Sequence, residues 1–455
     1  MATSERSYAD PTSQPQASSA ALTHARAVCA LLFGPVGTRS FDVRYWNGET
    51  EPARTPASFA LVIRYPGALR RMLFPPNELT IIEAALSGDI EIEGNMEAAM
   101  WIGDGINDRL KSPRTLFALL GHLRALPKVD SGEDVKSRRA ANVVRRAGDV
   151  HEPERDQAAI RYHYDVGNDF YALWLDERMV YSCAYFASAE DVDEHLGDAQ
   201  RAKLDLICRK LRLQPGDRLL DVGCGWGALI MHAVQHYGVQ ALGITLSEAQ
   251  AALARERIAA AGIGDQCRVE IRDYRKLDGE RFDKISSVGM VEHVGIENLP
   301  TYFKCLYDAL EPGGLLLNHG IVSVASARPP SRWDWLESRL WKRDVFLDQY
   351  VFPDGRLGPL SAVVAGGELV GFETRDVESL REHYALTLRA WLARLERNAE
   401  AAIALTDPRT YRIWRLYMAG SAFGFSTGRL NVVQTLFVKQ DAVGGAHLPL
   451  RRSFL

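Results

Sequence analysis

"LLDVGCGWGAL", residues 219–229, is the stretch that decides the fold of this chain. Its apolar start predicts a short buried strand that ends near Asp221, and the residues after Gly227 predict a helix. Two further glycines, Gly223 and Gly225, lie between the strand and the helix. Glycines at such a position let the backbone turn tightly and let a ligand approach the main chain closely. The stretch therefore predicts a strand–loop–helix unit that holds a ligand where the strand ends.

The sequence on both sides of this stretch alternates strands and helices. The predicted elements are strands within residues 218–224, 240–246, 267–274 and 282–290, and helices within residues 197–213, 227–238 and 247–262. Strands that alternate with helices of this length form a parallel, doubly wound sheet. Ligands of such sheets bind at the carboxyl ends of the strands. We therefore expect an α/β fold with its site at that edge.

The spacing within the glycine loop indicates which ligand is bound. A bare GxGxG pattern is also compatible with NAD or FAD binding, but here one residue separates Asp221 from the first glycine, and the glycines follow each other at intervals of two. This pattern resembles motif I of the class I S-adenosylmethionine (SAM) methyltransferases, which have a Rossmann-like fold. In that class an acid at the end of the second strand meets the ribose, whereas this chain offers Thr245 and Gln250 there. Asp273 and Tyr274 end the next predicted strand and are expected to meet the adenine.

The composition excludes several other classes of protein. The 455 residues are 47% hydrophobic and 25% charged, which is typical of a globular protein of two or three domains. The formal net charge of -4 argues against a dedicated nucleic-acid binder. The six cysteines form no CxxC pattern, so they predict neither a disulfide framework nor a metal site and suit the cytoplasm. No apolar run approaches the ~18–20 residues of a bilayer span, so membrane contact is expected to be peripheral.

Four segments are expected along the chain. Residues 1–20 are rich in Ser, Ala, Gln and Pro and predict a disordered tail, and residues 25–127 predict a small α+β domain. Residues 128–158 form a charged linker, which is either a solvated helix or a basic patch that faces anionic headgroups. Residues 159–442 hold the glycine loop and the predicted sheet.

Reactive side chains are found in three further places. The segment 162–186 holds eight aromatic residues in twenty-five positions together with Cys183, so it is either core or site. Glu292 and His293 follow one predicted strand, and His319 lies near the end of another. An acid and an imidazole at neighbouring strand ends suit an acid–base pair. A glutamate that caps a helix and a histidine bonded to a backbone carbonyl are the structural alternatives.

Eight motifs in a fixed order resemble one protein family. They are "YHYDVGNDFY", "MVYSCAYF", "LLDVGCGWG", "GITLSEAQ", "VGMVEHVG", "LNHGI", "YVFPDG" and "HYALTLRAW". Over about residues 160–440 the chain is similar to cyclopropane-fatty-acyl-phospholipid synthase and the related mycolic acid cyclopropane synthases. Residues 25–127 resemble the N-terminal lipid-binding domain of the longer synthases. The resemblance implies that a cis double bond in a phospholipid acyl chain attacks the methyl group of SAM, and that the resulting cation loses a proton to close a cyclopropane ring.

The resemblance also implies roles for individual residues. A bound bicarbonate ion is the general base of the family, and its holders correspond here to Cys183, Glu292, His319, the backbone of Ile321, and Tyr417. The residues that the resemblance assigns to SAM are Tyr181, Ser182, Asp221, Gly223, Gly225, Thr245, Gln250, Asp273 and Tyr274.

Two departures from the family pattern affect these assignments. Many relatives have a cysteine where this chain has Ser421, so a thiolate at that position is ruled out. The segment 329–346 is longer than in the compact members and interleaves Trp333, Trp335 and Trp341 with basic residues. It is either an interfacial element or a helix that packs on the core.

The leading hypothesis is a cyclopropane synthase that acts on unsaturated membrane phospholipids from the cytoplasmic face of the inner membrane. The resemblance is also consistent with a homodimer. One alternative is a fatty acyl methyltransferase that makes a methyl-branched or methylene product, and two others are a lipid carrier without activity and a methyltransferase of small polar metabolites. Aromatic faces stabilise cations, and Tyr164, Phe170 and Tyr185 are the candidates for facing the cation.

Overall fold

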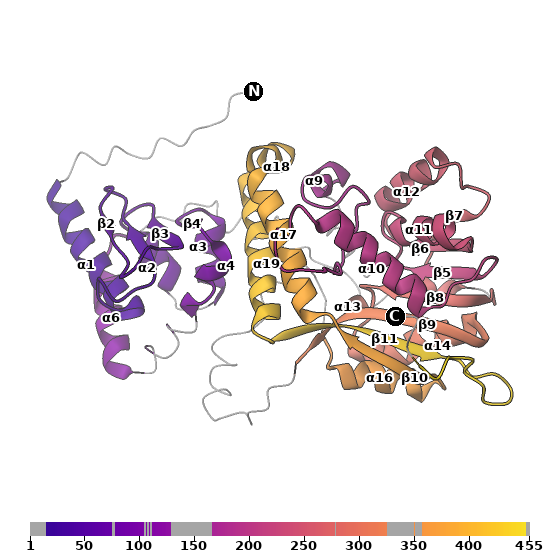
Figure 1. Ribbon diagram of the computed structural model, residues 1–455. Coiled ribbons are helices and arrows are strands. Elements are labelled where there is room, and N and C mark those ends of the chain that lie inside the picture. Colours follow the sequence, from indigo (N-terminus) through magenta and orange to yellow (C-terminus); the bar gives the residue numbers. More distant parts are fainter. Residues whose placement is uncertain are drawn as a thin grey trace. The chain divides into compact units, whose positions relative to one another are not determined.

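The computed structural model describes residues 15–74, 78–103, 106, 109, 112–128, 166–277, 279–324, 350 and 357–451. These residues form two compact units, the first within Met1–Val143 and the second within Val144–Pro329 and Leu347–Leu455 (Figure 1). Tyr164, the segment 329–346 and most of the expected linker lie outside the described residues. Across the described part of the chain, no helix is both long and apolar enough to cross a bilayer.

The N-terminal unit combines helices with a four-stranded sheet. Its elements are α1 (Pro15–Phe33), β1 (Asp42–Arg44), β2 (Thr50–Glu51), β3 (Phe59–Ile63), α2 (Ala68–Leu73), α3 (Glu78–Leu86), β4 (Ile90–Gly94), α4 (Met96–Ala99) and α6 (Pro113–Ala125). The sheet order is β2-β1-β3-β4, and Val28 and Leu32 of α1 share one core with Val43 and Leu61 of the sheet. The helix α1 begins at Pro15 and so overlaps the last residues of the expected disordered tail, residues 1–20.

The second unit is built on a seven-stranded sheet. Its strands are β5 (Arg218–Val222), β6 (Gln240–Thr245), β7 (Cys267–Ile271), β8 (Phe282–Val288), β9 (Leu310–Ser323), β10 (Glu373–Ser379) and β11 (Leu430–Val438). The order is β10-β11-β9-β8-β5-β6-β7, in which β11 is antiparallel to both neighbours and the other pairs are parallel. The predicted parallel, doubly wound sheet is confirmed, and β5 to β8 each lie within their predicted ranges.

Successive side chains of the sheet pack on opposite faces, as the pleat of a strand requires. The helices on the two faces are α10 (Leu196–Lys210), α11 (Ala228–Tyr237) and α12 (Glu248–Ala260) on one, and α13 (Val291–Val294), α14 (Leu299–Ala309) and α16 (Leu360–Leu369) on the other (Figure 1). Leu219 and Leu317 belong to the core shared with α10 and α11, whereas Leu220 and Leu316 belong to the core shared with α14. Both faces of the central strands are therefore buried.

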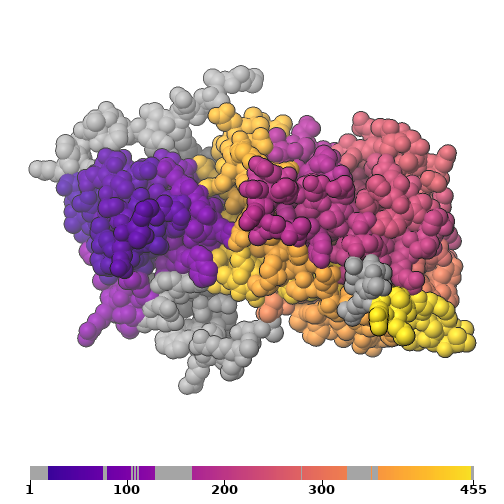
Figure 2. All heavy atoms as spheres, viewed as in Figure 1, coloured from indigo at the N-terminus to yellow at the C-terminus, as the bar shows by residue number. Residues whose placement is uncertain are grey.

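A group of helices outside the sheet carries a cluster of buried aromatic residues. They are α9 (Asn168–Ala172), α17 (Arg381–Arg397), α18 (Ala399–Leu405) and α19 (Pro408–Ser426). The segments around α9 and α17 lie side by side although they are far apart in sequence (Figure 2), and the Asn398 side chain donates to the Leu173 carbonyl over 2.9 Å. The Trp174 ring lies 5.4 Å from that of Trp391, and the Tyr171 ring lies 5.5 Å from that of Trp414. The described aromatic residues of the segment 162–186 are thus largely core.

The glycine loop is fixed against β6 by close backbone contact. The amides of Gly223 and Cys224 both donate to the Ile244 carbonyl, over 2.9 and 3.0 Å. A Cβ atom added to Gly243 would lie 2.8 Å from both the side chain of Cys224 and the side chain of Ile230. Gly243 therefore permits the loop and the start of α11 to lie directly on the strand.

We predict that Gly243→Ala lowers the free energy of unfolding by about 1–3 kcal/mol, because overpacking at this contact displaces the loop. Urea unfolding followed by circular dichroism measures the change. Gly264→Ala is the matched control, since no atom lies within 4 Å of a Cβ added there. Equal stability of the two variants would contradict the proposed role of this contact.

Candidate active site

A cavity opens at the carboxyl ends of β5, β6, β7 and β8, where the fold places ligands. All nine residues assigned to SAM on the basis of sequence line this cavity. They are Tyr181, Ser182, Asp221, Gly223, Gly225, Thr245, Gln250, Asp273 and Tyr274. Residues that span almost one hundred positions of the sequence are therefore brought to one site by the sheet.

Asp221 is a buried acid at the start of the glycine loop. It lies opposite Gly243 on β6 and Ser286 on β8, and the Ser286 hydroxyl donates to its Oδ1 over 2.7 Å. Burial raises the pKa of Asp221 to about 6, although the Ser286 hydrogen bond and the charge of Lys203 both act to lower it. The carboxyl group thus stays ionised at neutral pH.

Thr245 and Gln250 occupy the position where many methyltransferases have an acid. The hydroxyl of Thr245 donates to Oε1 of Gln250 over 2.9 Å and accepts from the amide of Ser247 over 3.2 Å. Ser247 is the N-cap of α12, and its hydroxyl accepts from the Gln250 amide. These bonds fix the side chains of Thr245 and Gln250. Because Oε1 of Gln250 accepts from Thr245, the orientation of its side-chain Nε2 is fixed as well.

Asp273 and Tyr274 stand after β7, at the start of the short helix η2 (Tyr274–Lys276). Asp273 accepts hydrogen bonds from the amide and the guanidinium group of Arg275, at 2.6–2.8 Å. Burial alone would raise the pKa of Asp273, but these bonds outweigh it and hold the pKa below its ordinary value. The Tyr274 ring is held edge-on by Tyr302, with centroids 5.3 Å apart.

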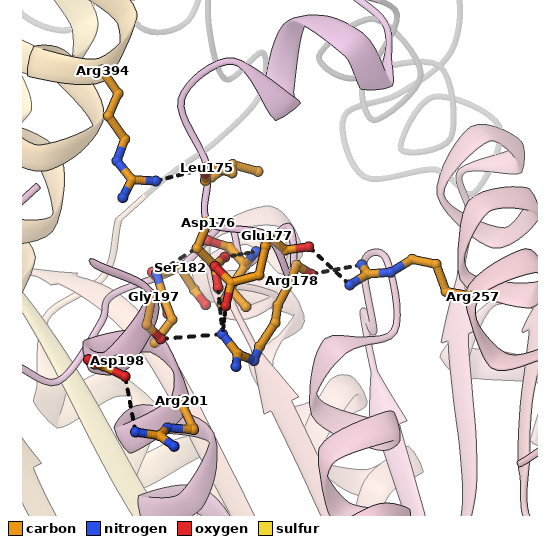
Figure 3. Close-up of polar contacts among 12 residues, drawn as sticks. Leu175, Asp176, Glu177, Arg178, Ser182, Gly197, Asp198, Arg201, Arg257 and Arg394 are labelled. Atoms are coloured by element: carbon orange, nitrogen blue, oxygen red, sulfur yellow. Dashed lines mark hydrogen bonds and ion pairs between the residues drawn. The ribbon is translucent and has the colours of Figure 1, made fainter. Parts of the chain in front are cut away.

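Tyr181 and Ser182 are carried by a loop that arginines hold in place (Figure 3). Arg257 of α12 donates to the carbonyls of Glu177 and Arg178, and Arg394 of α17 donates to the carbonyl of Leu175, all at 2.9–3.2 Å. Inside the loop, the buried carboxylate of Asp176 accepts from the Val180 amide over 2.9 Å. Met179, which lines the cavity, has a positive φ of 59°, a conformation that costs energy for any residue but glycine. These contacts hold the strained loop against the cavity.

Glu292 is the acid at the other side of the cavity. It lies on α13, and its Oε1 accepts from the Ile321 amide over 2.7 Å. Its Oε2 is buried and has no hydrogen-bond partner among the described residues. Burial raises the pKa of Glu292 to about 7, since the bond from Ile321 offsets only part of the cost of desolvation. Glu292 thus titrates near neutral pH and has one oxygen available to a ligand.

Of the five residues assigned to bicarbonate, Glu292, Ile321 and Tyr417 line the cavity, and Cys183 and His319 are absent from its lining. The Cys183 thiol is fully buried and donates to the Ala184 carbonyl over 3.3 Å, and burial raises its pKa above the ordinary range. His319 is bonded through Nδ1 to the side-chain amide of Gln434, and burial lowers its pKa to about 3. Sequence spacing could not show that Cys183 points at main-chain carbonyls, or that the Ile321 amide already serves Glu292.

The aromatic residues of the cavity come largely from outside the aromatic-rich segment. Tyr384, Tyr417 and Phe425, from α17 and α19, line it together with Trp226 and Tyr274. Phe170 is fully buried in the helical core, and Tyr185 stacks on His383 with ring centroids 4.6 Å apart. Neither Phe170 nor Tyr185 lines the cavity, and the third candidate, Tyr164, lies outside the described residues, so the ring that faces the cation stays a prediction. Ser421, where many relatives have a cysteine, does line it.

Lys203 is a cavity residue that sequence reasoning missed. It lies on the buried side of α10 with only 1% of its surface exposed, and its Nζ donates to the Ser182 hydroxyl over 2.6 Å. The available signal was its position four residues after Ala199 and four before Ile207, on the apolar face of the helix. Lysine is almost never fully buried unless it is paired, so a lysine on the apolar face of a helix indicates a functional or structural partner.

Comparison with known proteins agrees with this geometry. Residues 151–435 match the family model described as "Mycolic acid cyclopropane synthetase". A relative from Pseudomonas putida named "Probable fatty acid methyltransferase" is 40% identical over 90% of this chain and 94% of its own length. "Cyclopropane mycolic acid synthase 1" of Mycobacterium tuberculosis is 38% identical over 61% of this chain and 95% of its own.

A solved structure of a similar protein contains SAH, the product that SAM leaves after methyl transfer. A mycolic acid cyclopropane synthase crystallised with SAH and CTAB superposes with a TM-score of 0.57 at 36% identity, over 62% of this chain and 97% of the other. The sheet order, the cavity at the strand ends and these matches lead to one conclusion. The chain belongs to the mycolic acid cyclopropane synthetase family and is a SAM-dependent methyltransferase.

Proposed function

We propose that the protein transfers the methyl carbon of SAM to the cis double bond of an unsaturated acyl chain in a membrane phospholipid and closes a cyclopropane ring. The observation that carries this proposal is that one cavity joins the residues suited to SAM with an apolar, aromatic wall and an acid other than Asp221. The wall includes Tyr384, Phe425 and Leu430, and the acid is Glu292. A polar acceptor would require polar partners there, whereas an acyl chain requires apolar ones.

SAM would supply an electrophilic methyl group, and bicarbonate a proton acceptor. The π electrons of the alkene form the new carbon–carbon bond as the sulfur–methyl bond breaks. The ring closes when a C–H bond of the new methyl group gives its electrons to the cationic carbon and its proton to the base. An alkene is a weak nucleophile, so the chain must contribute by placement and by electrostatics. The rings of Tyr384 and Phe425 are suited to this, because an aromatic face stabilises a cation without capturing it.

Glu292 is the residue best suited to hold the bicarbonate. In its neutral form the free Oε2 donates a hydrogen bond to an oxyanion, while Oε1 keeps the bond from Ile321. A neutral acid also avoids trapping the cation as an ester, which a carboxylate in contact would do. Tyr417 lies in the same wall and offers a hydroxyl group.

Contact with the membrane is part of this proposal. The N-terminal unit exposes the large apolar side chains of Trp101 and Phe117, by 60% and 76% of their surfaces. Such side chains are favourable at a lipid surface, and the proposed location is the cytoplasmic face of the inner membrane. A fatty acyl methyltransferase that makes a methyl-branched or methylene product is the second candidate, because the Pseudomonas putida relative is named "Probable fatty acid methyltransferase".

We predict that incubation with SAM and vesicles of monounsaturated phospholipid yields cyclopropane acyl chains. Mass spectrometry of the released fatty esters shows the gain of one CH2 group, and a saturated methyl-branched product would carry two further hydrogens. Mild catalytic hydrogenation separates a ring, which resists it, from a methylene group, which does not. Turnover only on water-soluble acceptors would overturn the lipid proposal.

We predict that Glu292→Ala lowers turnover about 100- to 10,000-fold, the range for loss of a general base, because the bicarbonate loses the residue that holds it, and that the Kd for SAM is essentially unchanged. Single-turnover assays and calorimetry measure the two quantities. Glu297→Ala, at an exposed glutamate five residues further on, is the matched control and is expected to retain activity. Parallel loss of turnover and SAM binding in Glu292→Ala would show that Glu292 is only structural.

We predict that the bicarbonate concentration for half-maximal activity rises as the pH passes upward through about 7. Because burial raises the pKa of Glu292 to about 7, the residue is a neutral donor below this pH and a carboxylate that repels anions above it. Assays in degassed buffers with fixed bicarbonate concentrations measure the dependence. Glu292→Gln keeps a neutral donor at every pH and is expected to flatten the profile. An unchanged profile in Glu292→Gln would exclude Glu292 as the titrating group.

A further inference from the structure

The cavity contains a buried cation whose role is not explained by protein contacts. Nζ of Lys203 makes one hydrogen bond, to the Ser182 hydroxyl, and no ion pair with any described carboxylate. An ammonium group has three N–H donors, and a buried charge without a counter-ion is costly. Desolvation lowers the pKa of Lys203 to about 8, and the nearby carboxylates of Asp176 and Asp221 offset only part of this shift. The chain therefore keeps a charged donor at the cavity that it does not itself satisfy.

A second lysine on the same helix shows what a structural buried lysine looks like in this protein. Lys210 is equally inaccessible, but it forms ion pairs with Asp376 and Glu378 of β10. Lys203, in contrast, lies at a cavity and leaves donors unused. The difference indicates that the partner of Lys203 is a ligand.

The charges around the cavity indicate the kind of ligand group. Among the charged residues that line it, Arg275 forms an ion pair with Asp273, and Arg272 forms one with Glu280. Lys203 and Asp221 both line the cavity, each influences the pKa of the other, and no ion pair joins them. A cation and an anion that face one cavity without touching suit a zwitterion, whose carboxylate meets the lysine and whose ammonium group meets the aspartate. The amino-acid end of SAM is such a zwitterion, whereas bicarbonate carries only the anion.

We propose that Lys203, together with the Ser182 hydroxyl, binds the carboxylate of the methionine part of SAM. The loop that carries Ser182 is held by Arg257 and Arg394, so the hydroxyl is fixed before the ligand arrives. This inference rests on SAM as the cofactor and does not depend on which lipid product is formed.

The test compares the Kd of SAM with that of decarboxylated SAM, which lacks only the carboxylate, by calorimetry at neutral pH. We expect the wild-type protein to prefer SAM clearly, and Lys203→Met to bind SAM about 10- to 100-fold more weakly while it binds decarboxylated SAM as before. Lys210→Met is the matched control and should keep the wild-type preference. A wild-type protein that binds both ligands equally would overturn the proposal without any variant.

Two other outcomes would also overturn it. If Lys203→Met weakened the binding of SAM and of decarboxylated SAM equally, the role of Lys203 would be structural. An unchanged SAM affinity with an increased bicarbonate requirement would assign its charge to bicarbonate. Ser182→Ala is a second variant that keeps the proposal testable if the Lys203→Met protein does not fold. We expect it to raise the Kd of SAM severalfold and to leave the Kd of decarboxylated SAM unchanged. An unchanged Kd of SAM in Ser182→Ala would count against the site.

Discussion

The two hydrogen bonds from the glycine loop to the Ile244 carbonyl are the constraint on which the site depends. They fix the turn after β5 directly against β6, and this is possible because Gly243 leaves room for Cys224 and Ile230. With the loop in that place, the acid of β5 and the polar residues after β6 face the same cavity. A parallel sheet brings its carboxyl ends to one edge, so the residues after β7 and β8 join them without further contacts.

The sequence predicted the sheet better than the site because the two depend on different information. Strand and helix periodicity is local, and the four predicted strands are present within their ranges. All nine residues assigned to SAM lie at the carboxyl ends of strands, in the turns and helix starts that follow them, or in one loop, so topology gathers them. Cys183 and His319 are different, because their roles depend on where a side chain points. The Cys183 thiol faces the carbonyls of the adjacent Ala184 and of the distant Leu380, and His319 is bonded to the distant Gln434; no local pattern encodes the two distant pairings.

The aromatic-rich segment shows the same limit. Aromatic residues at high density were compatible with core or site, and most of the described ones in this segment are core. Their packing partners Trp391 and Trp414 come from α17 and α19, which also supply Tyr384 and Tyr417 to the cavity. The segment thus acts on the site indirectly, because it packs against the helices α17 and α19, which carry Tyr384 and Tyr417.

The titratable groups of the cavity divide it into two parts with different chemistry. Near the glycine loop, Lys203 and Asp221 form a charged part that suits a zwitterion. A zwitterionic ligand would supply the counter-charges that these two buried side chains lack in the protein. Beyond it, Glu292 is the acid among Tyr384, Tyr417 and Phe425, and its raised pKa keeps this part close to neutral. A cation formed on an acyl chain there would meet aromatic faces and a neutral donor, while Lys203 would disfavour its movement towards the charged part. Whether the cation closes a ring or follows another path would then depend on the proton acceptor held at Glu292, and not on how SAM is bound.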